Sequence, residues 1–110
     1  MEEYLRFFES LPRFHVLKIK PCYFNDVISG LKTFEIRKND RNFQVGDILV
    51  LVEYGDFKFT NRMTFVRVVY LTSFEQKEGF CVLGIQLIKK IRKFDFIIFD
   101  EGSLYVEKNI

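Results

Sequence analysis

Six charged side chains of both signs lie within the ten residues KTFEIRKNDR, positions 32–41. If this stretch contains a strand, alternation places Glu35 and Arg37 on one face and Phe34 and Ile36 on the other. We expect Phe34 and Ile36 to face the core. Glu35 and Arg37 would then lie about 7 Å apart on the opposite face, where they can pair or hold a polar ligand together.

The residues beside this strand extend the candidate site. Lys32 precedes the strand, Asn39 and Asp40 can cap or turn the backbone of the following loop, and Arg41 emerges beyond it. We predict a binding site that includes two residues of an earlier strand and a threonine on the Glu35 face. Its candidate residues are His15, Lys18, Lys32, Thr33, Glu35, Arg37, Asn39, Asp40 and Arg41.

The chemistry of these residues suits a nucleotide. Arginine can hold a phosphate or a base edge, a glutamate can accept from an exocyclic amine, and Tyr23 or Phe43 could stack on a base. A purely structural interpretation stays open: a Glu35–Arg37 pair and a loop fixed by Asn39, without any ligand. For His15 the plain alternative is a hydrogen-bonded core histidine, and for Lys18 it is a solvent-facing lysine.

Composition sets the broad class. The chain has 110 residues, of which 48% are hydrophobic and 14 are Phe, which favours one domain with one core. No apolar run approaches the roughly 20 residues of a membrane span, and the acidic start is unlike a secretory signal, so we expect a soluble, cytoplasmic protein. With two cysteines and one histidine, a zinc site is disfavoured. We expect two free, buried thiols and no cofactor or metal.

Charge is distributed unevenly along the chain. The net charge is only +2, which argues against non-specific coating of nucleic acid. The segment from Arg13 to Arg41, however, contains seven basic residues and three acidic ones, and a second basic run, KKIRK, covers 89–93. Such local patches can attract phosphates, although a solvated charged face would read the same way.

The elements that must position these residues are short. Tyr4, Phe7, Phe8 and Leu11 share one stripe of a helix that Pro12 ends. A second short helix, PCYFNDVISG, is predicted to begin at a proline and to end at a glycine. The predicted strands are FHVLKIK, TFEIR, a run ILVLVEY buried on both faces, two strands on either side of a polar TNR tip, FCVLGIQLI, and a final hairpin turned at 101–103.

This order of elements predicts a mainly β (α+β) fold, a compact barrel-like domain with two short helices and a C-terminal hairpin. We expect a single domain over 1–110, with its core at about 14–88, an N-terminal helix in 1–13 and a hairpin extension in 89–110. Gly84 is predicted to mark a bulge or a close approach of backbone.

The motifs HVLK, PCYF, SGLKTFEIRKNDR, FQVGD and a closing VLGI, in this order from His15 to Leu87, resemble a small family of bacterial and phage proteins of unknown function. That family lies within the ASCH group of PUA-like domains. The resemblance implies a PUA-like β-barrel whose cleft is flanked by the short helix and the charged strand. It also implies RNA, a nucleotide or a modified nucleoside as ligand.

A related ASCH branch hydrolyses the amide of an acetylated cytidine with a motif similar to GxKTxTxR and a Glu from a later strand. Lys32 matches the lysine of that motif, whereas Glu35 stands in place of the catalytic threonine and Thr33 lies two residues away. Glu53 could supply the later carboxylate. The resemblance thus leaves an enzyme open but disfavoured, with Lys32 and Glu35 as its catalytic candidates.

Three functions remain in order of preference. The first is an RNA- or nucleotide-binding module, and the second is a small hydrolase acting on a modified nucleoside. The third is a phage-type interaction or inhibitor module, in which the apolar tail at 94–106 binds a protein partner or a second copy.

Overall fold

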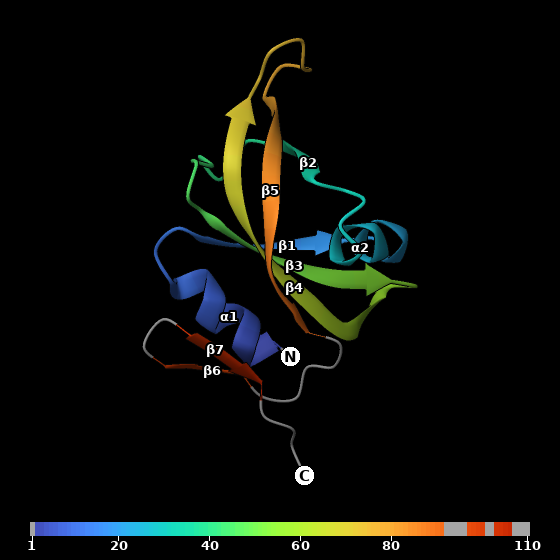
Figure 1. The fold of residues 1–110 in the computed structure, drawn as a ribbon, viewed down its shortest axis with the longest axis vertical. Coiled ribbons are helices and arrows are strands. Elements are labelled where there is room, and N and C mark those ends of the chain that lie inside the picture. Colours follow the sequence, from blue (N-terminus) through green and yellow to red (C-terminus); the bar gives the residue numbers. More distant parts are fainter. Residues whose placement is uncertain (1, 92–96, 101–102, 107–110) are drawn as a thin grey trace.

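The computed structural model describes residues 2–91, 97–100 and 103–106 (Figure 1). The fold is mostly β, as predicted. Its elements are α1 (Glu2–Ser10), β1 (Phe14–Ile19), α2 (Pro21–Ile28), β2 (Phe34–Lys38), β3 (Ile48–Gly55), β4 (Lys58–Thr72), β5 (Phe80–Ile91), β6 (Ile97–Asp100) and β7 (Ser103–Val106).

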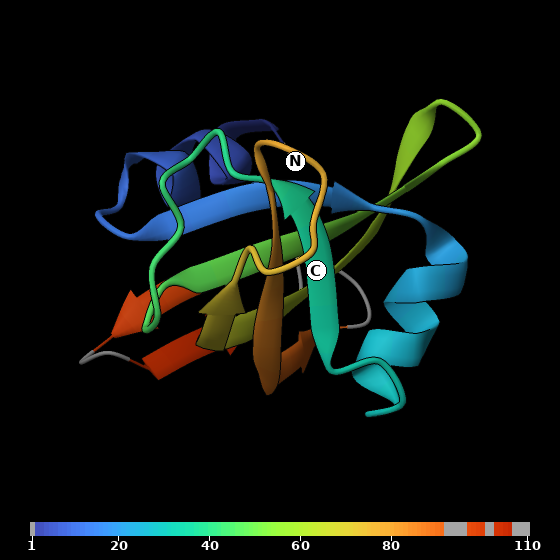
Figure 2. The same ribbon diagram turned by 90° about the horizontal axis from the view of Figure 1, so that it is seen from above.

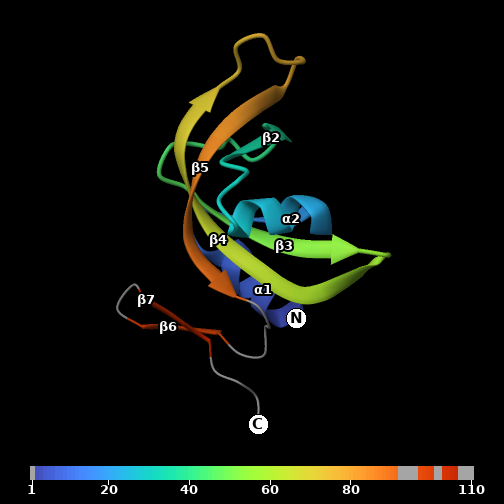
Figure 3. The same ribbon diagram turned by 45° about the vertical axis from the view of Figure 1, so that its right-hand side comes forward.

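One five-stranded sheet, in the order β1-β3-β4-β5-β2, forms the body of the protein. β1 runs parallel to β3, and the other neighbours are antiparallel. The long strands β4 and β5 bend strongly, so the sheet curls into a half-barrel (Figure 3). Register shifts between Phe65 and Val66 and between Val68 and Tyr70 interrupt their pairing, and such bulges increase local bending.

The sheet carries a core on each face because β3 is apolar on both. Leu49 and Leu51 pack in the larger cluster, with α2 and the inner residues of β4 and β5. Val50 and Val52 pack in the smaller cluster, together with Phe8 of α1. The prediction that this run is buried on both faces is confirmed.

The second helix begins and ends as its sequence indicates. Pro21 occupies its first turn, where a missing N–H costs nothing, and Gly30 beyond its C-terminus has φ +84°. Gly55, at the end of β3, lies against this helix start, since a Cβ there would come 2.8 Å from Cγ of Pro21. The β3–β4 hairpin is therefore packed closely against α2.

The polar segment TNR does not form a turn, contrary to prediction. The turn lies at Asp56 and Phe57, and β4 continues through the triplet. A register shift between Val52 and Tyr54 lies opposite this part of β4. Two of the three residues of the triplet, Thr60 and Arg62, bond the buried carboxylate of Glu53, which accounts for their polar character.

The structure also tests the predictions for Gly84 and for the two cysteines. Gly84 lies in close contact with Tyr70, whose Cβ would be 3.1 Å from an added Cβ, so the predicted close approach is confirmed. Cys81 is free and buried as expected, and burial raises the pKa of its thiol. Cys22 is free but exposed on α2, so the expectation of two buried thiols was wrong.

The final hairpin is present, because β6 pairs antiparallel with β7. The predicted turn at 101–103 and the basic run at 89–93 each lie partly outside the described residues. The side chains of the 94–106 tail lie wholly outside them. Among the described residues, no helix is long and apolar enough to cross a membrane.

Candidate ligand-binding pocket

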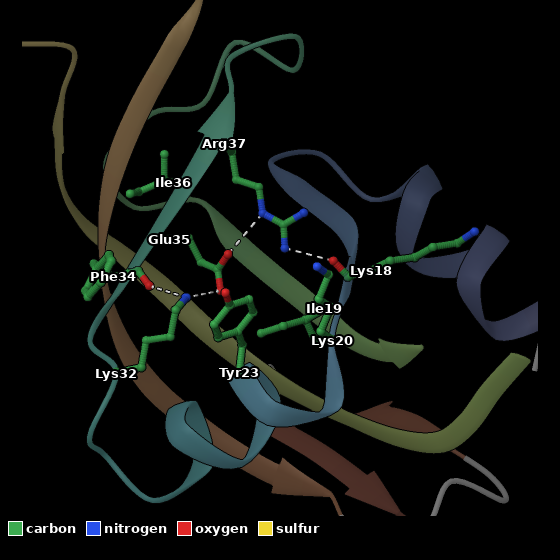
Figure 4. Close-up of a pocket in the computed structure, with 9 residues that line it drawn as sticks. All are labelled: Lys18, Ile19, Lys20, Tyr23, Lys32, Phe34, Glu35, Ile36 and Arg37. Atoms are coloured by element: carbon green, nitrogen blue, oxygen red, sulfur yellow. Dashed lines mark hydrogen bonds and ion pairs between the residues drawn. The ribbon is translucent and has the colours of Figure 1, made fainter. Parts of the chain in front are cut away.

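The charged strand faces inward, opposite to the sequence prediction. Glu35 is only 4% exposed, whereas Phe34 is 43% and Ile36 53% exposed. The reason is its register: Glu35 pairs with Leu83 of β5, and directly paired residues project from the same face of a sheet. Leu83 belongs to the larger core cluster, on the concave side of the sheet. Glu35 and Arg37 therefore point to the concave side, whereas Phe34 and Ile36 point outward (Figure 4).

Glu35 is the centre of an ionic triad. Lys32 Nζ donates to its Oε1 at 2.9 Å, and Arg37 Nε donates to its Oε2 at 3.0 Å. Lys32 also donates to the backbone oxygen of Phe34 at 2.7 Å. Glu35 and Arg37 therefore pair, which is one of the two arrangements that the sequence left open. Two cations around one carboxylate leave the triad with a net charge of +1, which favours an anionic ligand nearby.

The triad opens into a pocket of about 450 Å³, which we call the Glu35 pocket. This volume lies within the usual range of small-molecule sites. β1, α2 and β2 supply the walls (Figure 4). The lining residues are Lys18, Ile19, Lys20, Tyr23, Lys32, Phe34, Glu35, Ile36 and Arg37.

Two aromatic rings stand beside the cation at the pocket. Lys32 Nζ lies 5.4 Å from the ring centroid of Tyr23 and 5.1 Å from that of Phe34. Both residues are almost half exposed, so part of each side chain is open to solvent. Phe43, the other proposed stacking residue, is instead buried in the core against His15, with ring centroids 4.9 Å apart.

Arg37 also joins the two edges of the sheet. β1 and β2 are the edge strands, and the curl brings them towards each other (Figure 2). Arg37 Nη2 donates to the backbone oxygen of Lys18 at 2.8 Å, and Arg41 Nη1 donates to that of Val16 at 2.8 Å. Side chains thus bridge this gap, which we call the seam, where a closed barrel would have strand pairing.

The remaining predicted site residues lie elsewhere. His15 Nε2 bonds Asp47 at 2.8 Å and belongs to the structural cluster of Arg13 and Asp47. Asn39 caps its loop by accepting from the Phe43 backbone N–H at 2.9 Å. The two others outside the Glu35 pocket are exposed: Thr33, whose backbone oxygen accepts from Ile85 N, and Asp40, whose carboxylate is 4.0 Å from Arg41 Nε.

Two further buried carboxylates serve the fold. Burial opposes ionisation of Asp47, but hydrogen bonds from Arg13, the Gln44 backbone and His15 outweigh it and hold its pKa below the usual range. The Arg62 guanidinium lowers the pKa of Glu53 against the opposing effect of burial, with help from Thr60. Glu53 therefore pairs within β3 and β4 and does not line the Glu35 pocket.

The sequence indicates Tyr23 as a stacking residue but does not single out Lys20, although both residues line the Glu35 pocket. The signal was Pro21, which fixes the start of α2 directly after β1 and sets the flanking side chains beside the strand end. No group of three His, Cys, Asp or Glu side chains within the described residues could hold a metal ion. The groups at the Glu35 pocket suit a polar organic anion.

Comparison with known proteins places this geometry in a family. Residues 14–85 match the model described as Domain of unknown function (DUF3850), and the chain belongs to that family. The matched range contains every residue that lines the Glu35 pocket. It excludes α1 and the C-terminal hairpin.

A protein of Escherichia phage P2, titled "Uncharacterized 12.9 kDa protein in GpA 3'region", is 37% identical over 62 residues. The match covers 56% of this chain and 57% of the phage protein, so the chain spans little more than half the length of that relative. The predicted link to a phage-related family of unknown function is confirmed in this form.

Proposed function

We propose that this member of the DUF3850 family binds RNA or a nucleotide, with a base in the Glu35 pocket and a phosphate beside Arg37. We further propose that it belongs to the ASCH group of PUA-like domains, as its motif order suggests. The curled sheet, with its cleft between the short helix and the charged strand, supports that assignment.

The observation that carries the proposal is the orientation of β2. Folding stability alone favours apolar side chains inside and charged ones outside, because burying a charge costs free energy unless it is fully paired. Here Phe34 and Ile36 remain partly exposed while Glu35 is buried at the base of an open pocket. Such a departure from the usual pattern is expected where a strand serves a ligand.

Each wall of the pocket offers a distinct interaction. Each Glu35 oxygen accepts one hydrogen bond from the residues that the structure describes and retains lone pairs for an amine of a base. Arg37 uses two of its five N–H donors on described partners, Glu35 and the Lys18 carbonyl. Its remaining donors can hold a phosphate, and the exposed face of Tyr23 can stack on the base.

The test is a titration of the protein with labelled single-stranded RNA, duplex RNA and DNA, at low and high salt. Arg37→Gln should weaken binding by about tenfold or more, since one charge-assisted hydrogen bond is worth about 1.5–3 kcal/mol. Lys38→Gln is the matched control, because it removes the same charge from the next residue of β2, on the opposite, exposed face.

Thermal melts must show that the Arg37→Gln, Glu35→Gln and Lys38→Gln variants are all folded. Salt-sensitive binding that is lost in Arg37→Gln and in Glu35→Gln, but kept in Lys38→Gln, is the expected result. Equal losses of affinity in Arg37→Gln and Lys38→Gln would show that binding depends on the net charge of the protein and not on the position of Arg37. Absence of binding to every probe by the folded protein would refute the proposal.

Hydrolysis of an amide on a modified nucleoside is the second candidate, favoured by the 2.9 Å contact between Lys32 and Glu35 inside the pocket. Thr33 does not line the pocket, so the nucleophile would be water that Glu35 deprotonates. The oxygen of that water would bond the acyl carbon, and the C–N bond of the amide would break. The leaving amine would take the proton that Glu35 had accepted. Incubation with acetylated cytidine tests this: acetate release that Glu35→Gln abolishes supports it, and no release contradicts it.

A further inference from the structure

A second hollow lies next to the Glu35 pocket, on the α1 side of the seam. It has a volume of about 380 Å³, and Lys18 and Arg37 line both spaces. Arg37 spans from β2 to the Lys18 carbonyl between them, so a guanidinium group forms part of their common wall. Figure 4 shows the Lys18 side chain extending away from Glu35, towards α1.

The second hollow is basic and includes an aromatic ring. Arg41 joins Lys18 and Arg37 there, against a single acidic side chain, Glu9. Phe59 lines the same space, with Lys18 Nζ 5.6 Å from its ring centroid. This combination of cations and an aromatic surface is the type that binds single-stranded nucleic acid, where phosphates meet cations and bases meet rings.

The edge of β1 adds to this chemistry. As an edge strand, β1 presents backbone groups that no strand of the described part of the chain pairs, and the carbonyls of Val16 and Lys18 already accept from the two arginines. The Arg41 side chain is 40% exposed. Among the described residues, its partners are the Val16 carbonyl, which accepts from Nη1, and the Asp40 carboxylate, which is 4.0 Å from Nε. Both arginines therefore stay fixed at the seam while other N–H groups remain for a ligand.

We propose that the two hollows are consecutive nucleotide subsites, and that the ligand is a single-stranded nucleic acid of at least two nucleotides. Its connecting phosphodiester lies across the seam, at Lys18, Arg37 and Arg41. This inference rests on the proposed function and adds a minimum ligand length to it. A mononucleotide fills only the Glu35 pocket, whereas a dinucleotide also enters the second hollow, towards which the Lys18 side chain extends and where Arg41 lies.

The experiment compares the affinities of a ribonucleoside monophosphate, the corresponding 3′–5′ dinucleotide and the trinucleotide for the full chain. The dinucleotide should bind at least about tenfold tighter than the mononucleotide, because its phosphodiester gains charge-assisted contacts with Lys18 and Arg41. A third nucleotide should add much less. Arg41→Gln should remove most of the dinucleotide's advantage, and so should Lys18→Ala, which keeps the backbone carbonyl that Arg37 needs.

The variants separate subsite loss from unfolding. Lys38→Gln, on the outer face of β2, should retain the tenfold preference, and melting temperatures identify any variant that fails to fold. If Arg41→Gln unfolds the chain, Lys18→Ala decides alone. Equal affinity for the mononucleotide and the dinucleotide would overturn this inference and leave the proposed function standing. Binding of neither would overturn both.

Discussion

The inward orientation of Glu35 can be tested without a ligand, by comparing Ile36→Ala with Leu83→Ala. Both substitutions remove three carbons from a strand residue, so the change in side-chain size is the same, and only Ile36→Ala also loses a β-branched side chain. Leu83 is fully buried, and its truncation should cost about 2–5 kcal/mol, from lost burial and the cavity left behind.

Ile36 is 53% exposed, so it gains about half of the roughly 1.5–3 kcal/mol that full burial provides. Its truncation opens to solvent and leaves no cavity. We therefore expect a loss of about 1 kcal/mol, a shift of about 5 °C in melting temperature for a chain of this size. Urea unfolding with unchanged m-values gives both numbers.

The comparison has a clear opposite outcome. If Ile36→Ala destabilises the protein as much as Leu83→Ala does, Phe34 and Ile36 face the core, as the sequence alone suggests. Glu35 would then lie outside, and the pocket described around it would not exist.

Three further predictions concern the rest of the fold. Arg62→Met should cost about 3 kcal/mol in urea unfolding, because it leaves the buried Glu53 carboxylate without its cation; a loss under 1 kcal/mol would contradict this. Asp47 and Glu53 have lowered pKa values in the folded state, so stability should be level above about pH 5 and fall as the pH drops below the unfolded value of about 4. Asp47→Asn should flatten that acid dependence, measured by urea unfolding from pH 2 to 7, and an unchanged profile would refute the assignment. Gly55→Ala should cost about 1–3 kcal/mol because its Cβ would meet Pro21 at 2.8 Å, and an unaltered melting temperature would show that the contact is absent.

Sequence patterns predicted the elements better than their orientations. Runs such as ILVLVEY are apolar at every position, so burial on both faces follows without further information. TFEIR alternates, and alternation defines two faces but not which one points inward. Pairing with Leu83, 48 positions further along the chain, decides this for Glu35, and such long-range register cannot be read locally.

For the candidate site too, the sequence indicated which residues take part but not how the fold arranges them. The concentration of ionic residues indicated Lys32, Glu35 and Arg37, and the structure brings these three together. The bridges from Arg37 and Arg41 to carbonyls of β1 depend on the curl of the sheet, which no local motif specifies. The suggested role of the 94–106 tail in binding a partner stays a prediction.

The most direct test of nucleotide binding in the Glu35 pocket is an NMR titration of ¹⁵N-labelled protein with a short single-stranded RNA. We predict amide shift changes at the residues that line the pocket, which are 18–20, Tyr23, Lys32 and 34–37, and their loss in the Glu35→Gln variant. Shift changes that leave these pocket residues unmoved, or shifts at the pocket that persist undiminished in Glu35→Gln, would contradict nucleotide binding there.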